Sequence, residues 1–158
     1  MHMCASTRSK QPADAPEDVK EFLCACANVR RASRVITQFY DSVFQAGGHS
    51  IVQFGLLHAL SLSKIATQAQ LGATLTIDPT TLSRTLRPLL RKKWIERIPG
   101  SDRREQYLQL TAAGRKQLKK AQPSWLRAQA RLRKSLGDAN WAQMQSLLTK
   151  AVEAVQKA

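Results

Sequence analysis

The segment from Asp78 to Trp94, DPTTLSRTLRPLLRKKW, constrains the fold more than any other stretch of the sequence. Asp78 suits the N-cap of a helix, and Pro79 suits the first helical position, where a missing N–H removes no hydrogen bond. The expected helix has an apolar face and a basic, polar face, formed by Leu82, Leu86, Leu89 and Leu90 and by Thr80, Arg84, Arg87 and Arg91 respectively. Pro88 removes one internal hydrogen bond, so we expect a bend there and not a break. The pattern predicts a helix with its leucines in a core and its arginines in water.

The segments on either side of this helix predict a unit that reads DNA. Thr67 and Gln70 form a capping-box pattern that opens a short helix to about Leu75, and residues 76–77 then make a tight turn. Residues 94–98 and 106–110 are predicted strands, joined by the turn-rich tip PGSDRRE. Together these parts make a winged helix-turn-helix. In such a unit the second helix fits the major groove, and the hairpin lies in or beside the minor groove.

Long helices are expected before and after this unit. Residues 17–46 carry an apolar stripe, formed by Phe22, Cys26, Val29, Ile36, Tyr40 and Val43. Residues 50–61 are dense in apolar side chains and should be buried nearly all round. Thr111 can cap a further helix that runs to about Leu136, with a bend expected at Pro123. Gly137 should end that helix, and Asp138 should cap the last one.

The last helix carries apolar residues at intervals of 3 and 4, which is a heptad seam formed by Trp141, Met144, Leu148, Ala151 and Val155. We interpret Trp94, Trp125 and Trp141 as packing residues in the core or in a dimer. The predicted fold is therefore mainly α with a small β-hairpin wing. It consists of a mobile tail at 1–16, a winged helix-turn-helix at 50–111, and a helical dimerisation region formed by 17–46 and 112–158.

The charge distribution indicates a polyanionic partner for the middle of the chain. The formal net charge is +14, and residues 79–135 hold 16 of the 25 Lys and Arg but only three of the 11 Asp and Glu. Basic stripes of this kind are the usual footprint of nucleic-acid binding. No apolar run approaches the roughly 20 residues of a membrane helix, and the N-terminus lacks the pattern of a secretion signal. We therefore expect a cytoplasmic protein without a membrane partner.

Three blocks of the sequence resemble the MarR (multiple antibiotic resistance regulator) family of transcription factors. They are IVQFGLLHAL at 51–60, ATQAQLGATLTIDPTTLSRTLRPLLRKKWIERIPGSDRREQYLQLT at 66–111, and AAGRKQL directly after it. The resemblance covers about two thirds of the chain. It implies an obligate homodimer that binds double-stranded DNA at a palindromic operator and usually represses transcription, without a cofactor.

The resemblance also implies which residues contact DNA. In the recognition helix these are Thr80, Thr81, Ser83, Arg84 and Arg87, and in the wing they are Asp102, Arg103 and Arg104. In the family's D-x-R wing motif the acid fixes an arginine that enters the minor groove, which here is Arg104, and Arg103 is expected to contact the DNA backbone. The alternative is that Asp102 and Arg104 form only a salt bridge within the turn.

Cys24 and Cys26 point about 200° apart on a helix, so they cannot easily bond to each other. Cys26 lies on the apolar stripe, and its simplest interpretation is a small buried hydrophobic residue. The peroxide-sensing branch of the family is similar in having a reactive Cys fourteen residues before a Tyr, as Cys26 and Tyr40 are here, although its second Tyr near Ile51 is absent. Fourteen helical residues span about 21 Å, so Cys26 and Tyr40 could meet only across a dimer. Redox sensing by Cys26, Tyr40 and Cys24 is thus one hypothesis.

No catalytic pattern is present: the three histidines are scattered, and there is no phosphate-binding loop and no set of metal ligands. The sequence therefore predicts a regulator and not an enzyme. Two alternatives stay open, a regulator that senses a small molecule or an oxidant and an architectural protein that coats DNA without a signal. A discrete palindromic footprint would indicate the regulator, and a continuous ladder would indicate the coating protein.

Overall fold

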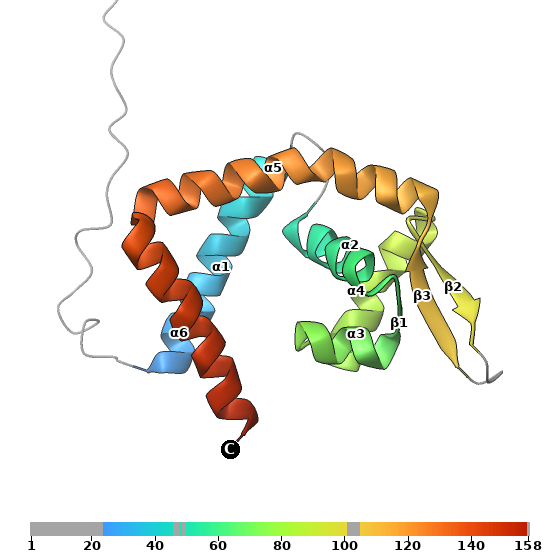
Figure 1. Ribbon diagram of the computed structural model, residues 1–158, viewed down its shortest axis with the longest axis horizontal. Helices are drawn as coiled ribbons and strands as arrows, with labels where there is room; N and C mark the ends of the chain where they lie inside the picture. The colour runs from blue at the N-terminus through green and yellow to red at the C-terminus, as the bar shows by residue number, and fades with distance from the viewer. Residues whose placement is uncertain (1–23, 46–47, 49, 101–104, 158) are drawn as a thin grey trace, which may run out of the picture. The chain divides into compact units, whose positions relative to one another are not determined.

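The computed structural model describes residues 24–45, 48, 50–100 and 105–157 (Figure 1). The chain divides into two compact units, Met1–Ile36 and Thr37–Ala158. The described part of the first unit is the beginning of helix α1, Ala25–Phe44, and the rest of α1 belongs to the second unit. The predicted tail at 1–16 and the first predicted helical turns after Glu17 lie outside the described residues.

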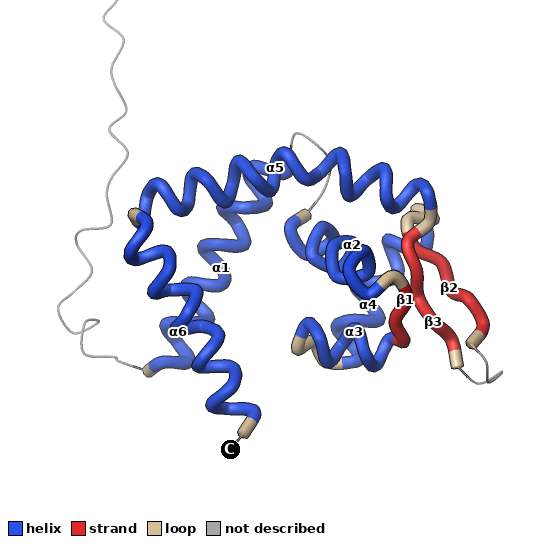
Figure 2. Tube along the Cα trace, viewed as in Figure 1, coloured by secondary structure: helices blue, strands red, loops and turns tan. Residues whose placement is uncertain are grey.

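The second unit is mainly α-helical with one small sheet, as the sequence predicts (Figure 2). Its remaining elements are α2 (Ile51–Ser63), β1 (Ile65–Thr67), α3 (Gln68–Leu75), α4 (Pro79–Arg91), β2 (Ile95–Pro99), β3 (Gln106–Leu110), α5 (Ala112–Leu136) and α6 (Asp138–Gln156). The sheet is antiparallel with strand order β1-β3-β2. The hairpin of β2 and β3 was predicted, but β1 was not. Its three residues overlap the capping sequence of α3 and are too few to show an alternating pattern.

Side-chain caps set the start of most helices. Ser50 accepts a hydrogen bond from the Gln53 amide, and Thr67 and Gln70 form the predicted reciprocal capping box. Helices α4 and α5 continue through their internal prolines, so neither proline breaks its helix.

The prediction that Asp138 caps the last helix is wrong. Gly137 occupies the N-cap position of α6 without a side-chain cap, and the Asp138 carboxylate instead accepts a hydrogen bond of 2.6 Å from Arg133 Nε. A helix N-terminus tolerates Asp in its first turn as well as at its cap, so the residue type did not distinguish the two positions.

The core lies within the winged unit and is built chiefly from leucines of α2, α3, α4 and β3. The largest fully buried side chains in these elements and in β2 are Leu56, Leu57, Leu60, Leu71, Leu82, Leu86, Leu89, Ile95 and Leu108. The predicted apolar face of α4 is confirmed. The prediction that α2 is buried nearly all round is wrong, because Val52 is 44% exposed and His58 also faces solvent.

The terminal helix α6 differs from the winged unit because it has no buried residue. Along the heptad seam, Trp141 and Met144 are half-buried, whereas Leu148 and Val155 are 44% and 77% exposed. Within the described residues, no helix is both long enough and apolar enough to cross a membrane.

Candidate DNA interface

Helix α4 presents its basic residues to solvent on the side opposite its buried leucines. Arg84, Arg87 and Arg91 are all exposed, and so are Lys92 and Lys93 directly after the helix. Among the predicted contact residues with hydroxyl groups, Thr80 and Thr81 are exposed and Ser83 is half-buried. A helix about 10 Å wide with such a face fits the major groove of B-DNA.

Asp78 anchors the N-terminal end of this helix. Its carboxylate accepts a 2.9 Å hydrogen bond from the Thr81 amide. Hydrogen bonds from the Thr81 side chain and then from the Thr81 backbone lower the pKa of Asp78 below its ordinary value. The hydroxyl of Thr81 therefore also bonds to the cap, whereas the Thr80 side chain has no hydrogen-bond partner among the described residues and is the freer hydroxyl of the pair.

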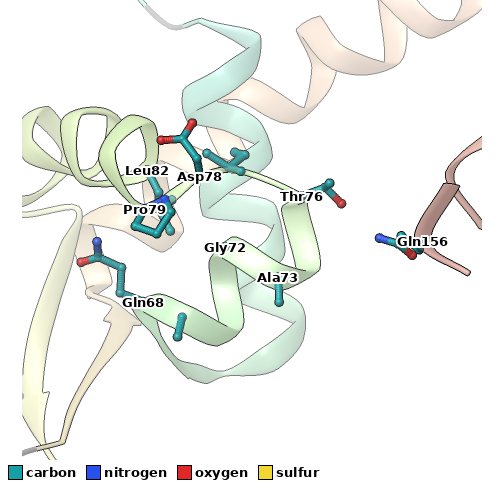
Figure 3. Close-up of a pocket in the computed structure, with 10 residues that line it drawn as sticks. Gln68, Gly72, Ala73, Thr76, Asp78, Pro79, Leu82 and Gln156 are labelled. Carbon is teal, nitrogen blue, oxygen red and sulfur yellow. The ribbon is translucent and has the colours of Figure 1, made fainter. Parts of the chain in front are cut away.

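The turn between α3 and α4 is tight. Thr76 adopts a left-handed conformation with φ of 52°, and the Ile77 amide donates to the Gly72 carbonyl at 2.9 Å. A Cβ on Gly72 would lie 3.1 Å from the Ile77 carbonyl oxygen and 3.4 Å from a Leu82 methyl group, so glycine lets the two helices approach closely (Figure 3).

An open hollow of about 720 Å³ lies beside this turn. Gln68, Ala73, Thr76 and Pro79 are among its lining residues, and Gln156 of α6 lines it from across the gap (Figure 3). No local pattern in the sequence indicates this hollow, because its lining residues come from α3, α4, the turn between them and α6.

The wing is held by cross-strand side-chain contacts as well as by its backbone ladder. Gln109 donates to Glu96 at 2.8 Å, and Arg97 donates to Gln106 at 3.4 Å. The Gly100 amide donates to the Glu105 carbonyl at 2.8 Å and closes the described part of the hairpin. The predicted wing contacts Asp102, Arg103 and Arg104 lie outside the described residues. Arg97 is a further exposed basic residue of the wing, and no motif in the sequence indicates it.

The base of the wing is joined to the start of α5. The Thr111 hydroxyl lies 2.7 Å from the Lys93 carbonyl oxygen, and the Thr111 amide donates to the Trp94 carbonyl at 3.1 Å. A Cβ on Gly114 would lie only 1.9 Å from the same Trp94 oxygen. Glycine is therefore required where the start of α5 passes Trp94, and we name Lys93, Trp94, Thr111 and Gly114 the wing clamp. The segment AAGRKQL contains no local pattern that predicts this role for Gly114.

The comparisons with known proteins agree with this geometry. The MarR family model matches residues 50–106. A structure of the transcriptional regulator MosR from M. tuberculosis in complex with DNA is 35% identical and has a TM-score of 0.72, and the match covers 84% of this chain and 98% of that chain. The chain belongs to the MarR family. A second MosR structure is 31% identical with a TM-score of 0.75, and this match covers 87% of this chain and 98% of that one.

Other MarR-family structures share the fold at lower identity. A mutant of MarR from E. coli complexed with operator DNA is 22% identical, with a TM-score of 0.73 over 80% of this chain and 91% of that one. No curated protein sequence matches the chain. The chain is thus a transcriptional regulator with the MarR-family winged helix, and α4 is its candidate DNA-reading element.

The predicted redox residues of this MarR-family chain have different environments. Cys24 and Cys26 are both exposed in the single chain, so the interpretation of Cys26 as a buried hydrophobic residue stays a prediction that depends on the proposed dimer. Val29, in the same half of α1, is also exposed, at 51%.

Tyr40 is buried instead, and its hydroxyl donates to Gln129 Oε1 at 2.6 Å. Burial raises the pKa of Tyr40 above its ordinary value. Its hydroxyl already has an acceptor in α5, so in this conformation it is not free to donate to a thiol. Among the described residues, no cluster of three or more His, Cys, Asp or Glu side chains could hold a metal ion.

Proposed function

We propose that the protein is a dimeric repressor that binds a palindromic operator and is released from it by a signal. The observation that carries the proposal is the arrangement of α4, in which Arg84 and Arg87 face solvent while Leu82, Leu86 and Leu89 anchor the helix in the core. Anchoring by the core keeps the rotation of α4 fixed, and a fixed rotation is what base-specific contacts require. The binding of DNA by MosR, which is 35% identical, supports the same role for this chain.

In this proposal Thr80, Thr81, Ser83, Arg84 and Arg87 contact bases and phosphates in the major groove. Asp102 and Arg104 form the minor-groove contact of the wing, and Arg103 contacts the backbone. Exposed arginines pair with guanine through two parallel hydrogen bonds, and this is the commonest specific contact in the major groove.

Dimerisation follows from apolar surface that the chain leaves uncovered. In α6, Leu147, Leu148, Val152 and Val155 are each between 44% and 77% exposed. Contiguous apolar patches of this kind mark protein–protein interfaces. We infer that a second copy covers them, and that the two recognition helices then meet half-sites about one turn of DNA apart.

The test of the DNA-binding proposal is selection of bound duplexes from a random pool, followed by footprinting on the selected sequence. A protected palindrome with two half-sites supports the repressor. A continuous ladder of protection without sequence preference would instead identify an architectural protein that coats DNA.

The signal is proposed to be either oxidation of Cys26 or binding of a small ligand. Exposure of Cys26 makes its thiolate accessible to a hydroperoxide, which would transfer its terminal oxygen to sulfur and leave as an alcohol, giving a sulfenic acid. Because the Tyr40 hydroxyl is already bonded to Gln129, activation of the thiol would come from charge, with Arg30 or Arg31 as the nearest candidates in sequence.

The alternative signal is a small ligand in the hollow beside the α3–α4 turn. A ligand there would contact Pro79 and Thr76, and so could tilt α4. Gel-shift titrations with organic hydroperoxide on wild type, Cys24→Ser and Cys26→Ser distinguish the two signals. Release of wild type and Cys24→Ser but not Cys26→Ser supports oxidation. Equal binding by all three under oxidant would assign the signal to a ligand.

A further inference from the structure

Helix α5 carries a basic surface that the recognition helix and wing do not explain. Between Ala112 and Leu136 there are eight Lys and Arg and no acidic residue. Five of these, which share one face at spacings of 4, 7, 4 and 3, are Lys116, Lys120, Arg127, Arg131 and Lys134, and all five are exposed. We call these five residues together with Lys119 the α5 basic face.

Few of these charges are neutralised inside the chain. Arg127 donates to the Ser124 hydroxyl at 2.8 Å, and the Arg131 guanidinium lies 5.3 Å from the centre of the Phe39 ring. In the described part of the chain, the only ion pair is Arg133 with Asp138. The lysines at 116, 119 and 120 have no side-chain partner among those residues.

Like charges at i and i+4 of a helix repel each other and destabilise it. Lys116 with Lys120 and Arg127 with Arg131 are such pairs, and alternating signs would give the same solubility without the repulsion. The concentration of one sign therefore indicates a polyanionic ligand and not only a solvated surface.

The α5 basic face lies on a different side of α5 from the residues that this helix buries. Ala121 and Ala128 are buried, and α5 contacts α2 and β3. Figure 1 shows α5 and α3 on opposite sides of α2, and both α2 and α3 contact α4. We therefore expect a straight duplex that follows α4 to lie on the α3 side of α2, away from α5.

We propose that the α5 basic face binds the phosphate backbone of a second DNA duplex, so that one regulator holds two DNA segments. Lys116 and Lys134 are separated by about 27 Å along α5, which is about eight base pairs of B-DNA. Phosphate contacts carry no sequence information, so we expect this contact to be independent of sequence. This inference rests on the proposed repressor function in one respect only, namely that the first duplex, bound by α4, is the operator.

The experiment is a two-duplex capture. A biotinylated duplex with the selected operator is fixed on beads and loaded with protein, and a fluorescent 40-base-pair duplex of random sequence is then added. Wild type should retain the fluorescent duplex. The variant Lys116→Gln/Lys119→Gln/Lys120→Gln should still bind the operator duplex, but should retain at least about tenfold less of the second one. The log–log salt slope of second-duplex capture should fall by about three, one for each lysine.

A matched control removes the same charge elsewhere. Lys64→Gln/Lys150→Gln/Lys157→Gln changes three exposed lysines that lie outside α5, and it should retain the second duplex like wild type. If both triple variants lose the second duplex equally, net charge and not the α5 basic face is responsible, and the proposal is overturned. It is also overturned if the α5 variant captures the second duplex normally, or if it loses both duplexes together. Failure of wild type to bind the first duplex would instead refute the proposed operator binding.

Discussion

The winged unit, residues 50–111, and the terminal helix α6 differ in how far they bury their apolar side chains. In the winged unit Leu60 and Leu89 are completely buried, and their neighbours come from the same chain. In α6 no residue is buried, although its seam repeats apolar residues at helical spacing. Burial of a Leu or Val side chain stabilises by about 1.5–3 kcal/mol, so α6 leaves most of this free energy unrealised in the single chain.

The difference indicates that the winged unit is stabilised by its own chain, whereas α6 depends on the proposed second copy. The winged unit has a core of its own, so its stability should be independent of protein concentration. The stability of α6 should instead increase with concentration, because mass action links it to the proposed dimer. The recognition helix belongs to the first region, but the spacing of two recognition helices depends on the second.

The largest contrast should come from the same substitution in both regions. Leu89→Ala removes a side chain with no exposed surface and should lower the free energy of unfolding by about 2–5 kcal/mol at every concentration. Leu148→Ala, at a position 44% exposed, should cost much less in dilute protein and more in concentrated protein. Urea unfolding at two protein concentrations measures both. Equal, concentration-independent losses would remove the distinction between the regions.

A charge on the α6 seam should break the proposed dimer. Val155→Glu would place an unpaired carboxylate in the interface, and the dimer dissociation constant should rise about 100-fold, which corresponds to about 2.7 kcal/mol. Sedimentation measures the dissociation constant, and operator binding should weaken with it. Ser146→Glu adds the same charge off the seam and serves as the control. A wild-type protein that stays monomeric at micromolar concentration would contradict the proposed interface.

Two basic residues of the winged unit should separate specific from general binding. Arg84→Ala should cost about 1–3 kcal/mol on the selected operator and relax its sequence preference. Lys92→Ala should weaken all duplexes alike. The Lys92 ammonium lies 4.4 Å from the centre of the Trp94 ring, so the unfolding free energy of this variant must be measured in parallel. Equal losses by both variants on operator and random duplex would refute the assignment of α4.

The smallest expected effect is a pH dependence at the start of α4. The pKa of Asp78 is lower in the folded chain than in the unfolded one, because the Thr81 side chain and amide donate to the ionised carboxylate. The stability that it contributes is therefore present above the ordinary Asp pKa of about 3.9, and it is lost as the pH falls through the lower folded value. Asp78→Asn keeps a capping oxygen, so its acid unfolding curve should be shallower than that of wild type. Superimposable acid unfolding curves for wild type and Asp78→Asn would show that protonation of Asp78 does not change the stability.

The sequence predicted those parts of the fold that depend on local patterns. The capping box of Thr67 and Gln70, the cap at Asp78 and the leucine face of α4 are each set by residues within one or two turns of each other, and all three are confirmed. Membership of the MarR family was predicted from the sequence blocks at 51–60 and 66–111 and from AAGRKQL after them, and it is confirmed.

Features that depend on distant residues were missed. Strand β1 exists because Ala66 pairs with Leu108, and the exposure of Cys26 reflects what the rest of the chain leaves uncovered. The clash that makes Gly114 necessary involves an oxygen twenty residues earlier. No local pattern encodes such contacts. The roles of Thr80, Thr81, Ser83, Arg84 and Arg87 in DNA binding stay predictions, as do those of the three wing residues.

The wing clamp has a consequence for how this regulator could change its target. Thr111 bonds to Lys93 and Trp94, so the hairpin leaves and rejoins the body of the protein at one point. The base of the hairpin is fixed in the body of the protein, because Ile95 and Leu108 belong to the core and β3 pairs with β1. Tips of other lengths could therefore be exchanged only beyond this base, at about residues 99–106, as an interchangeable cassette. Minor-groove preference could then be altered by grafting, while the major-groove helix stays where it is.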